Sequence, residues 1–195
     1  ATEDITKMAA MSPSEKSYFE TSVLAHAKHR IAWLLILMFS ATITGTIITR
    51  YENAFAAIPL LVSFIPMLMD TGGNCGSQSS TLIIRGIALG EIQFSDLFRV
   101  MFKEFRVSLI VGVALALANG IRILIMYKNA GLALVIGLSL VATIVISKLI
   151  GCVLPLIAKK LHMDPAIMAS PLITTLVDTC SILIYFNIAT QVFQL

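Results

Sequence analysis

Polar residues that could bind a cation are concentrated in one apolar region of the chain, residues 66–81 (PMLMDTGGNCGSQSST). On an α-helix, positions i, i+4, i+7, i+8 and i+11 share one face, and here they are Asp70, Asn74, Ser77, Gln78 and Thr81. Unsatisfied polar groups are costly in hydrocarbon, so this face must meet protein or water. The pattern predicts the wall of an aqueous path; the alternative is a helix-packing seam held by polar side chains. Gly72 and Gly76 form a G-x-x-x-G pair, which allows close approach of another helix, and we expect a partner subunit to cover it.

A second polar face follows residues 166–193 (AIMASPLITTLVDTCSILIYFNIATQVF), with Asp178 near the middle. Residues at intervals of three or four positions fall within about 80° around a helix: Ser170, Thr174, Asp178, Ser181 and Tyr185. A carboxylate at the bilayer centre costs ~2.5–3.5 kcal/mol on the insertion scale, so it normally faces a partner or water. Oxygen ligands suit hard cations, and this face therefore predicts a cation path. The alternative is an ion pair between Asp178 and Lys148.

The elements that carry these faces are membrane helices. The chain has 195 residues, of which 57% are hydrophobic and 13% charged, whereas a soluble domain has about 25% charged residues. A span needs about 20 apolar residues, and five segments are long enough: 31–49, 54–84, 107–127, 132–157 and 166–193. The sequence thus predicts an all-α, polytopic domain of five transmembrane helices over residues 31–195.

Three of the remaining features refine this arrangement. The second segment exceeds one membrane thickness, so it must tilt, kink or break at Pro59 or Pro66. The charged residues 85–106 predict a short helix along the membrane surface. The fourth segment has small residues at successive i+4 positions, which favour a packing seam over a pore lining: Ser139, Thr143, Ser147 and Gly151. Lys148 beside them must reach the headgroups or an acid such as Asp70.

The distribution of Lys and Arg predicts the orientation. Ten of them lie on the side of the N-terminus: Lys7, Lys16, Lys28, Arg30, Arg85, Arg99, Lys103, Arg106, Lys159 and Lys160. Three lie on the other side, namely Arg50, Arg122 and Lys128. We therefore expect a multi-pass protein of the cell (inner or plasma) membrane with a cytoplasmic N-terminus and Leu195 outside. Residues 1–30 are predicted to be a cytoplasmic linker with an amphipathic helix, and a start at Ala1 rather than Met suggests a piece of a longer protein.

Several function classes are disfavoured. The net charge of +3 gives no case for a nucleic-acid partner. Cys75, Cys152 and Cys180 form no C-x-x-C motif, so neither a disulfide framework nor a zinc site is indicated. No nucleophile–base constellation occurs, and we predict that the protein is not an enzyme; an aspartyl pair of Asp70 and Asp178 is the weaker alternative.

Three segments carry a resemblance to a known family: PMLMDTGGNCGSQSS at 66–80, RGIALGEI at 85–92 and DPAIMASPLITTLVDTCSILIYF at 164–186. In these segments the chain resembles the membrane domain of the MgtE-type magnesium channels. The resemblance implies a homodimer in the lipid bilayer, with a pore between subunits lined by the second and fifth spans. Full-length members also carry cytoplasmic N and CBS domains that sense magnesium. Both are absent here, residues 1–11 resemble the tail of the CBS part, and residues 14–29 match the family's plug-like helix.

The resemblance also implies roles for individual residues. Asp178 is the expected central carboxylate of the Mg²⁺ site, and Thr174 occupies the family's backbone-carbonyl position. From their positions rather than from the resemblance, Glu91 and Asp164 are predicted to bind Mg²⁺ at the cytoplasmic mouth, because each lies just beyond a pore-lining span where Lys and Arg gather. The alternative is that both are solvated loop acids. The remaining predicted pore-lining residues are Asp70, Gly73, Asn74, Ser77, Gln78, Ser170, Thr175 and Ser181. Where the family often has a more strongly polar residue, this chain has Ser170.

The expected function is a magnesium-selective channel that carries hydrated Mg²⁺ inward, the ion being its cargo and ligand. The alternative is a secondary transporter of Mg²⁺, Mn²⁺ or Co²⁺ coupled to an ion gradient, although five spans allow no internal inverted repeat. A third possibility, a membrane anchor without transport, would leave the two polar faces without a purpose.

Overall fold

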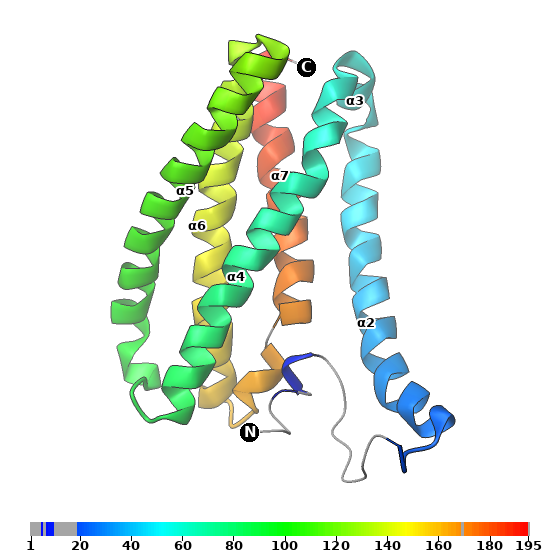
Figure 1. Cartoon of the computed structure of the whole chain (residues 1–195), viewed down its shortest axis with the longest axis vertical. Helices are drawn as coiled ribbons and strands as arrows, with labels where there is room; N and C mark the ends of the chain where they lie inside the picture. Colours follow the sequence, from blue (N-terminus) through cyan, green and yellow to red (C-terminus); the bar gives the residue numbers. More distant parts are fainter. Residues whose placement is uncertain (1–4, 6, 10–18, 169, 195) are drawn as a thin grey trace.

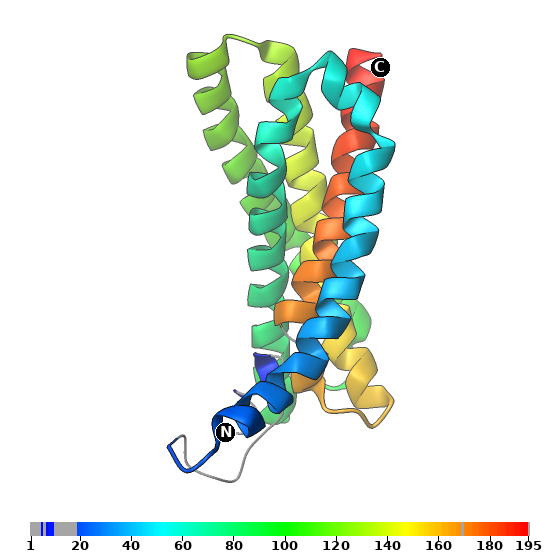
Figure 2. The ribbon, with the colours of Figure 1, turned by 90° about the vertical axis from the view of Figure 1, so that its right-hand side faces the viewer.

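The computed structural model describes residues 5, 7–9, 19–168 and 170–194. Within these ranges the secondary structure is helical, which confirms the predicted all-α class. In chain order the elements are α2 (Val23–Arg50), α3 (Glu52–Ala57), the 3₁₀ helix η1 (Pro59–Phe64), α4 (Ile65–Ala88), η2 (Phe94–Asp96), α5 (Leu97–Tyr127), α6 (Ala130–Lys160), η3 (Pro165–Met168) and α7 (Ser170–Phe193). The long helices run roughly side by side as a bundle (Figures 1 and 2).

Four helical segments of the described chain are long and apolar enough to cross a membrane: 23–50, 94–127, 130–160 and 165–193. Helix α4 has 24 residues and is more polar, but it runs through the bundle beside the others (Figure 1). It packs against both α6 and α7. The bundle therefore has the four apolar helices of a membrane domain and a fifth, polar helix among them.

The predicted second span is broken just before Pro59, one of the two prolines at which the sequence predicted a kink or break. Helix α3 ends at Ala57, and Ile58 adopts a non-helical conformation (φ −134°, ψ 80°) before Pro59 begins η1. Pro66 lies in the first turn of α4, where its missing N–H removes no helical hydrogen bond. The break places Asp70 in the second turn of α4. After the break, η1 is held against α7, because the Tyr185 hydroxyl donates to the Leu61 carbonyl oxygen at 2.8 Å.

The prediction of a surface helix over residues 85–106 is wrong. Helix α4 continues to Ala88, Gly90 makes the turn with a positive φ of 73°, and residues 97–106 are the first turns of α5. The charged pattern arises because Arg99, Lys103 and Arg106 are exposed along one side of α5, whereas Glu104 is buried on another. An amphipathic stretch thus continues directly into a membrane helix.

The predicted packing seam on α6 is confirmed. Ser139, Thr143 and Ser147 are almost fully buried, and a Cβ atom on Gly151 would overlap the backbone carbonyl oxygen of Gly76 on α4. The two helices therefore touch backbone to backbone, as small residues permit.

The glycine pair of α4 is used inside the chain, which corrects the expectation that a partner subunit covers it. A Cβ atom on Gly72 would lie 2.7 Å from Val177 Cγ1 and 2.8 Å from Thr143 Cγ2. On Gly76 it would lie 2.6 Å from Ile173 Cγ2. The close helix packing that G-x-x-x-G permits is thus made with α6 and α7 of the same subunit.

Helix α2 is the most peripheral of the long helices. Among its described residues only Thr44 is buried, and its hydroxyl oxygen lies 2.8 Å from that of Thr179 on α7. The helix begins at Val23 after the N-cap Ser22, whose side chain accepts a hydrogen bond from the Ala25 N–H. Of the predicted amphipathic helix over 14–29, residues 14–18 lie outside the described residues.

The two ends of the bundle carry different groups of basic residues. One end gathers the last turns of α4 and α6 with η2 and η3, and the other gathers α3, the α5–α6 turn and the C-terminus (Figure 1). The first end includes Arg85, Lys159 and Lys160. The second includes Arg50, which ends α2, and Lys128, which caps α5. The fold thus places these two groups at opposite ends of the bundle, and the end with Arg85, Lys159 and Lys160 is called the basic end below.

Candidate functional site

A groove of about 420 Å³ lies between α4 and α7. Its lining consists of Ile65, Pro66, Met69, Asp70, Gly73, Asn74, Thr174 and Asp178. The α4 contribution comes from one helical face, because these positions recur every three or four residues. Two carboxylates and an amide, which come from two separate helices, therefore line one groove. The sequence predicted a polar face on each of these helices.

Close contact between α4 and α7 beside the groove positions these groups. A Cβ atom on Gly73 would lie 2.8 Å from Thr174 Cγ2, so only glycine lets α7 approach this closely. Asp178 follows Thr174 by one helical turn and lines the same groove. The glycine thus fixes the distance between the two helices where both acids line the groove.

Hydrogen bonds within each helix orient the polar groups of the groove. The Asn74 amide Nδ2 donates to Asp70 Oδ2 at 3.1 Å, and the Thr174 hydroxyl donates to the Pro171 carbonyl at 2.9 Å. Asp70 and Asn74 are exposed on the isolated subunit, and Asp178 is half-buried. Oxygen atoms and negative charge in a groove of this kind favour a hard cation such as Mg²⁺.

The other predicted path residues lie outside this groove lining. Ser77 is half-buried and Gln78 exposed, further along α4. The Thr175 hydroxyl donates to the Pro171 carbonyl at 2.9 Å. Ser181 is 1% exposed and donates to the Val177 carbonyl at 2.7 Å, and Tyr185 is fully buried in the core. Ser170 begins α7, but its side chain lies outside the described part.

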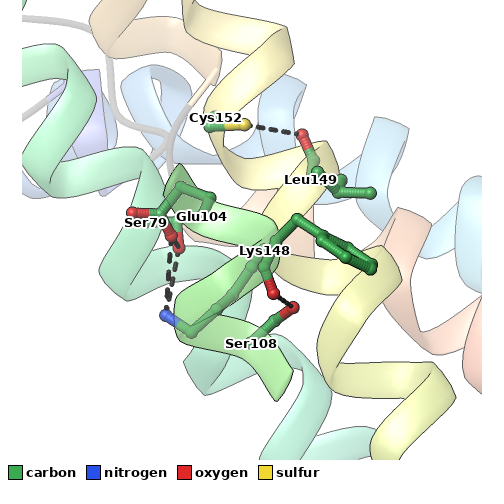
Figure 3. A network of polar contacts seen from close by, with 7 residues as sticks. Ser79, Glu104, Ser108, Lys148, Leu149 and Cys152 are labelled. Atoms are coloured by element: carbon green, nitrogen blue, oxygen red, sulfur yellow. Dashed lines mark hydrogen bonds and ion pairs between the residues drawn. The ribbon is translucent and has the colours of Figure 1, made fainter. Parts of the chain in front are cut away.

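Lys148 is paired with neither of the acids that the sequence suggested. Its Nζ atom lies 3.7 Å from Glu104 Oε2 on α5 and 3.2 Å from Ser79 Oγ on α4 (Figure 3). The proposed ion pairs with Asp70 or Asp178 are therefore wrong, and both acids stay available to the groove. Sequence reasoning missed Glu104 because its segment was assigned to the membrane surface. The available signal was that Glu104 lies on a different helical face from Arg99, Lys103 and Arg106.

The two acids predicted at the cytoplasmic mouth lie at the basic end of the bundle, in different surroundings. Asp164 Oδ2 accepts a hydrogen bond from Lys7 Nζ at 2.8 Å, and Oδ1 accepts one from the Ala166 N–H at 2.9 Å. The Lys7 ammonium, and then the Ala166 N–H, lower the pKa of the Asp164 carboxyl. Glu91 is exposed in the turn after α4. Among the described residues, no group of three or more His, Cys, Asp or Glu could hold a metal ion.

The bundle and its groove define a class: a polytopic membrane protein with an acidic groove between two of its helices. The family model of MgtE, described as a divalent cation transporter, matches residues 65–188, from the start of α4 to near the end of α7. The match covers more than half of the chain, which therefore belongs to the MgtE family of divalent cation transporters, and the resemblance stated from its motifs is confirmed.

Curated relatives extend the similarity over nearly the whole chain. The chain is 39% identical over 190 residues to the magnesium transporter MgtE of Bacillus subtilis. It is 36% identical to that of Thermus thermophilus and 33% identical to that of Enterococcus faecalis. These matches cover 97–98% of this chain but only 42% of each relative, so the chain spans less than half the length of these relatives.

Proposed function

We propose that this domain transports Mg²⁺ through a path lined by α4 and α7, with Asp178 as its main ion-binding side chain. The observation that carries the proposal is the groove in which Asp178 and Asp70 face the same space. The relatives are magnesium transporters, which supports Mg²⁺ as the cargo. Beyond the groove, we propose that the path is lined by Ser77, Gln78, Ser170 and Thr175.

The chemistry of Mg²⁺ explains how such a groove can pass an ion without trapping it. Mg²⁺ prefers octahedral oxygen coordination and loses water reluctantly, so it is typically held by one or two carboxylates and several waters. We propose that Asp178 binds the hydrated ion and that the backbone carbonyl of Thr174 contributes from one turn earlier. Conduction needs binding that is favourable enough to enter and weak enough to leave. The Asn74–Asp70 hydrogen bond leaves carboxylate oxygen for the ion's water shell.

We propose that the path is completed by a second copy of the chain. Asp70 and Asn74 are exposed on the isolated subunit, and a membrane would leave these polar groups facing lipid at high cost. A homodimer with the two grooves facing each other would shelter them and bring two Asp178 carboxylates to one axis. The pore would then lie at the subunit interface.

The orientation and the connection to further domains complete the proposal. The N-terminus would lie in the cytoplasm, with residues 1–30 as the linker to cytoplasmic N and CBS domains of a longer protein, and the C-terminus outside. Inward flow would be driven by the membrane potential, which is worth ~4.6 kcal/mol for a double charge per 100 mV.

Transport through an open channel and coupled transport can be told apart directly. Electrical recording of the reconstituted chain is expected to give single-channel current steps carried by Mg²⁺. Saturable flux that follows an imposed proton or sodium gradient, without current steps, would instead support the secondary transporter.

Neutralising the two acids at the basic end is expected to weaken a Mg²⁺ site at the cytoplasmic mouth. Glu91 is exposed, and Asp164 keeps its charge because the Lys7 ammonium lowers its pKa. In the longer protein, both could share an ion with the sensing domains. Calorimetric titration of Glu91→Gln/Asp164→Asn in the full-length protein should show one weaker site. An unchanged number and strength of sites would contradict the assignment.

The isolated chain is expected to be a dimer that opens but shuts poorly in response to Mg²⁺. Closure requires that the ion bind the closed state more tightly than the open one. A pore site at Asp178 binds the permeating ion and need not favour closure, while the proposed sensing domains are outside this chain. Mass measurement and crosslinking in mild detergent, with flux at low and high internal Mg²⁺, test both halves. A stable monomer would refute the first half, and shutting as steep as in the full-length protein would refute the second.

A further inference from the structure

A buried polar network joins α4 to α5 and α6 outside the groove lining (Figure 3). The Ser79 hydroxyl on α4 donates to Glu104 Oε2 on α5 at 2.6 Å. Lys148 Nζ on α6 donates to the same hydroxyl oxygen at 3.2 Å and lies 3.7 Å from Glu104 Oε2. Ser79 therefore bridges an ion pair and connects three helices through one atom.

The network lies deep in the bundle. Ser79, Glu104 and Lys148 are 0%, 8% and 5% exposed, respectively. A buried ion pair is a weak source of stability, because apolar residues of similar volume often serve as well, whereas removing one partner leaves a costly unpaired charge. Its better-attested use is to specify one arrangement of the helices that carry it. Here that arrangement includes α4, which carries one wall of the groove.

The place of Ser79 on α4 relates the network to the groove. Nine positions separate Asp70 from Ser79, and nine steps of about 100° put them on opposite faces of the helix. A rotation of α4 that turned Asp70 and Asn74 away from α7 would also carry Ser79 out of reach of Glu104 and Lys148. The adjacent Ser80 hydroxyl donates to the Met168 carbonyl at 3.1 Å and holds the same turn of α4.

We infer that Lys148 and Glu104 are positioning residues for the cation path. Acting through Ser79, they fix the rotation of α4 and so set how strongly the groove holds the ion. The inference rests on the proposed function of the groove, since it concerns the affinity of that same path.

The test compares charge removal singly and together in the full chain, reconstituted in vesicles and supplied with Mg²⁺. The variants are Lys148→Met, Glu104→Gln and the double variant, and the half-saturating Mg²⁺ concentration is measured separately from the maximal flux. Each single variant is expected to raise the half-saturating concentration by about tenfold or more, and the double variant should return to within about threefold of the parent chain. A half-saturating concentration that recovers in the double variant would show that the pair acts by positioning α4 and not by its charge on the ion.

A milder pair of variants tests the bridge without leaving a buried charge unpaired. Ser79→Ala is expected to raise the half-saturating concentration by about threefold or more. The matched control is Ser108→Ala, which removes another buried hydroxyl of the same region. That hydroxyl donates at 2.6 Å to the Phe105 carbonyl of its own helix, so its loss should leave the concentration unchanged.

Three results would overturn the inference. Shifts of opposite sign in Lys148→Met and Glu104→Gln would indicate long-range charge rather than position. A lower unfolding temperature with an unchanged half-saturating concentration would indicate a purely structural role. If the single charge variants cannot be recovered folded, equal half-saturating Mg²⁺ concentrations in Ser79→Ala and Ser108→Ala would contradict the inference. Absence of Mg²⁺ flux in the parent chain would instead refute the proposed function, and the two failures are therefore distinguishable.

Discussion

Asp178→Asn is expected to remove most Mg²⁺ flux and to weaken Mg²⁺ binding by at least about tenfold, while the chain still folds. At an effective dielectric constant of about 20, a unit charge and a divalent ion about 5 Å apart attract by roughly 6–7 kcal/mol before desolvation is counted. Retaining even a third of this attraction makes the carboxylate worth more than tenfold in affinity. The asparagine side chain has nearly the same shape as aspartate, so a loss of Mg²⁺ binding would be due to the lost charge.

Flux and calorimetric Mg²⁺ binding in vesicles or mild detergent measure this effect. Glu52→Gln is a suitable control, because Glu52 is an exposed acid in α3, outside the groove lining. Asp70→Asn should give a smaller loss, since the Asn74 amide already engages Asp70 Oδ2. Unchanged binding and flux in Asp178→Asn would show that the ion passes elsewhere.

The two walls of the groove could be anticipated from the sequence, because helical periodicity decides which side chains share a face. Only the resemblance to the family implied that the two walls line one path. Asp70 and Asn74 are four residues apart, as are Thr174 and Asp178, and all four line the groove. The same reasoning went too far on α7, since it placed Ser181 and Tyr185 on the path face. Both are buried, because they lie about one and two turns beyond Asp178 along α7, where the same helical face packs beside Gly72 of α4 and against Leu61 of η1.

The partners of Lys148 and of the glycine pair could not be derived in the same way. Each depends on which helices are neighbours, and a local pattern states only that a close or polar contact is needed. Glu104 lies 44 positions from Lys148, an interval that carries no helical signal. Its segment was predicted to lie along the membrane surface, because most of its charged residues are exposed and only Glu104 is buried. Gly72 and Gly76 equally fit an approach by α6 and α7 or by a second subunit.

The close approach of α4 and α6 provides the second large expected effect. A Cβ atom on Gly151 would overlap the Gly76 carbonyl oxygen, and this neighbour is backbone rather than a flexible side chain. Gly151→Ala must therefore push the two helices apart. Overpacking of this kind costs about 1–3 kcal/mol, occasionally more. Because α4 contacts α6 on one side and forms the groove with α7 on the other, the displacement should also impair transport.

The same methyl group placed elsewhere in the bundle provides the matched control. At Gly120 on α5, a Cβ atom would have no neighbour within 4 Å, and replacing a glycine inside a helix by alanine stabilises it by up to about 1 kcal/mol. The thermal unfolding temperature in detergent should therefore fall for Gly151→Ala and stay unchanged or rise for Gly120→Ala. Mg²⁺ flux should fall only in the first. Equal stability of the two variants would mean that α4 and α6 leave room for a methyl group between their backbones, and the glycine contact would then not be what positions the wall of the groove.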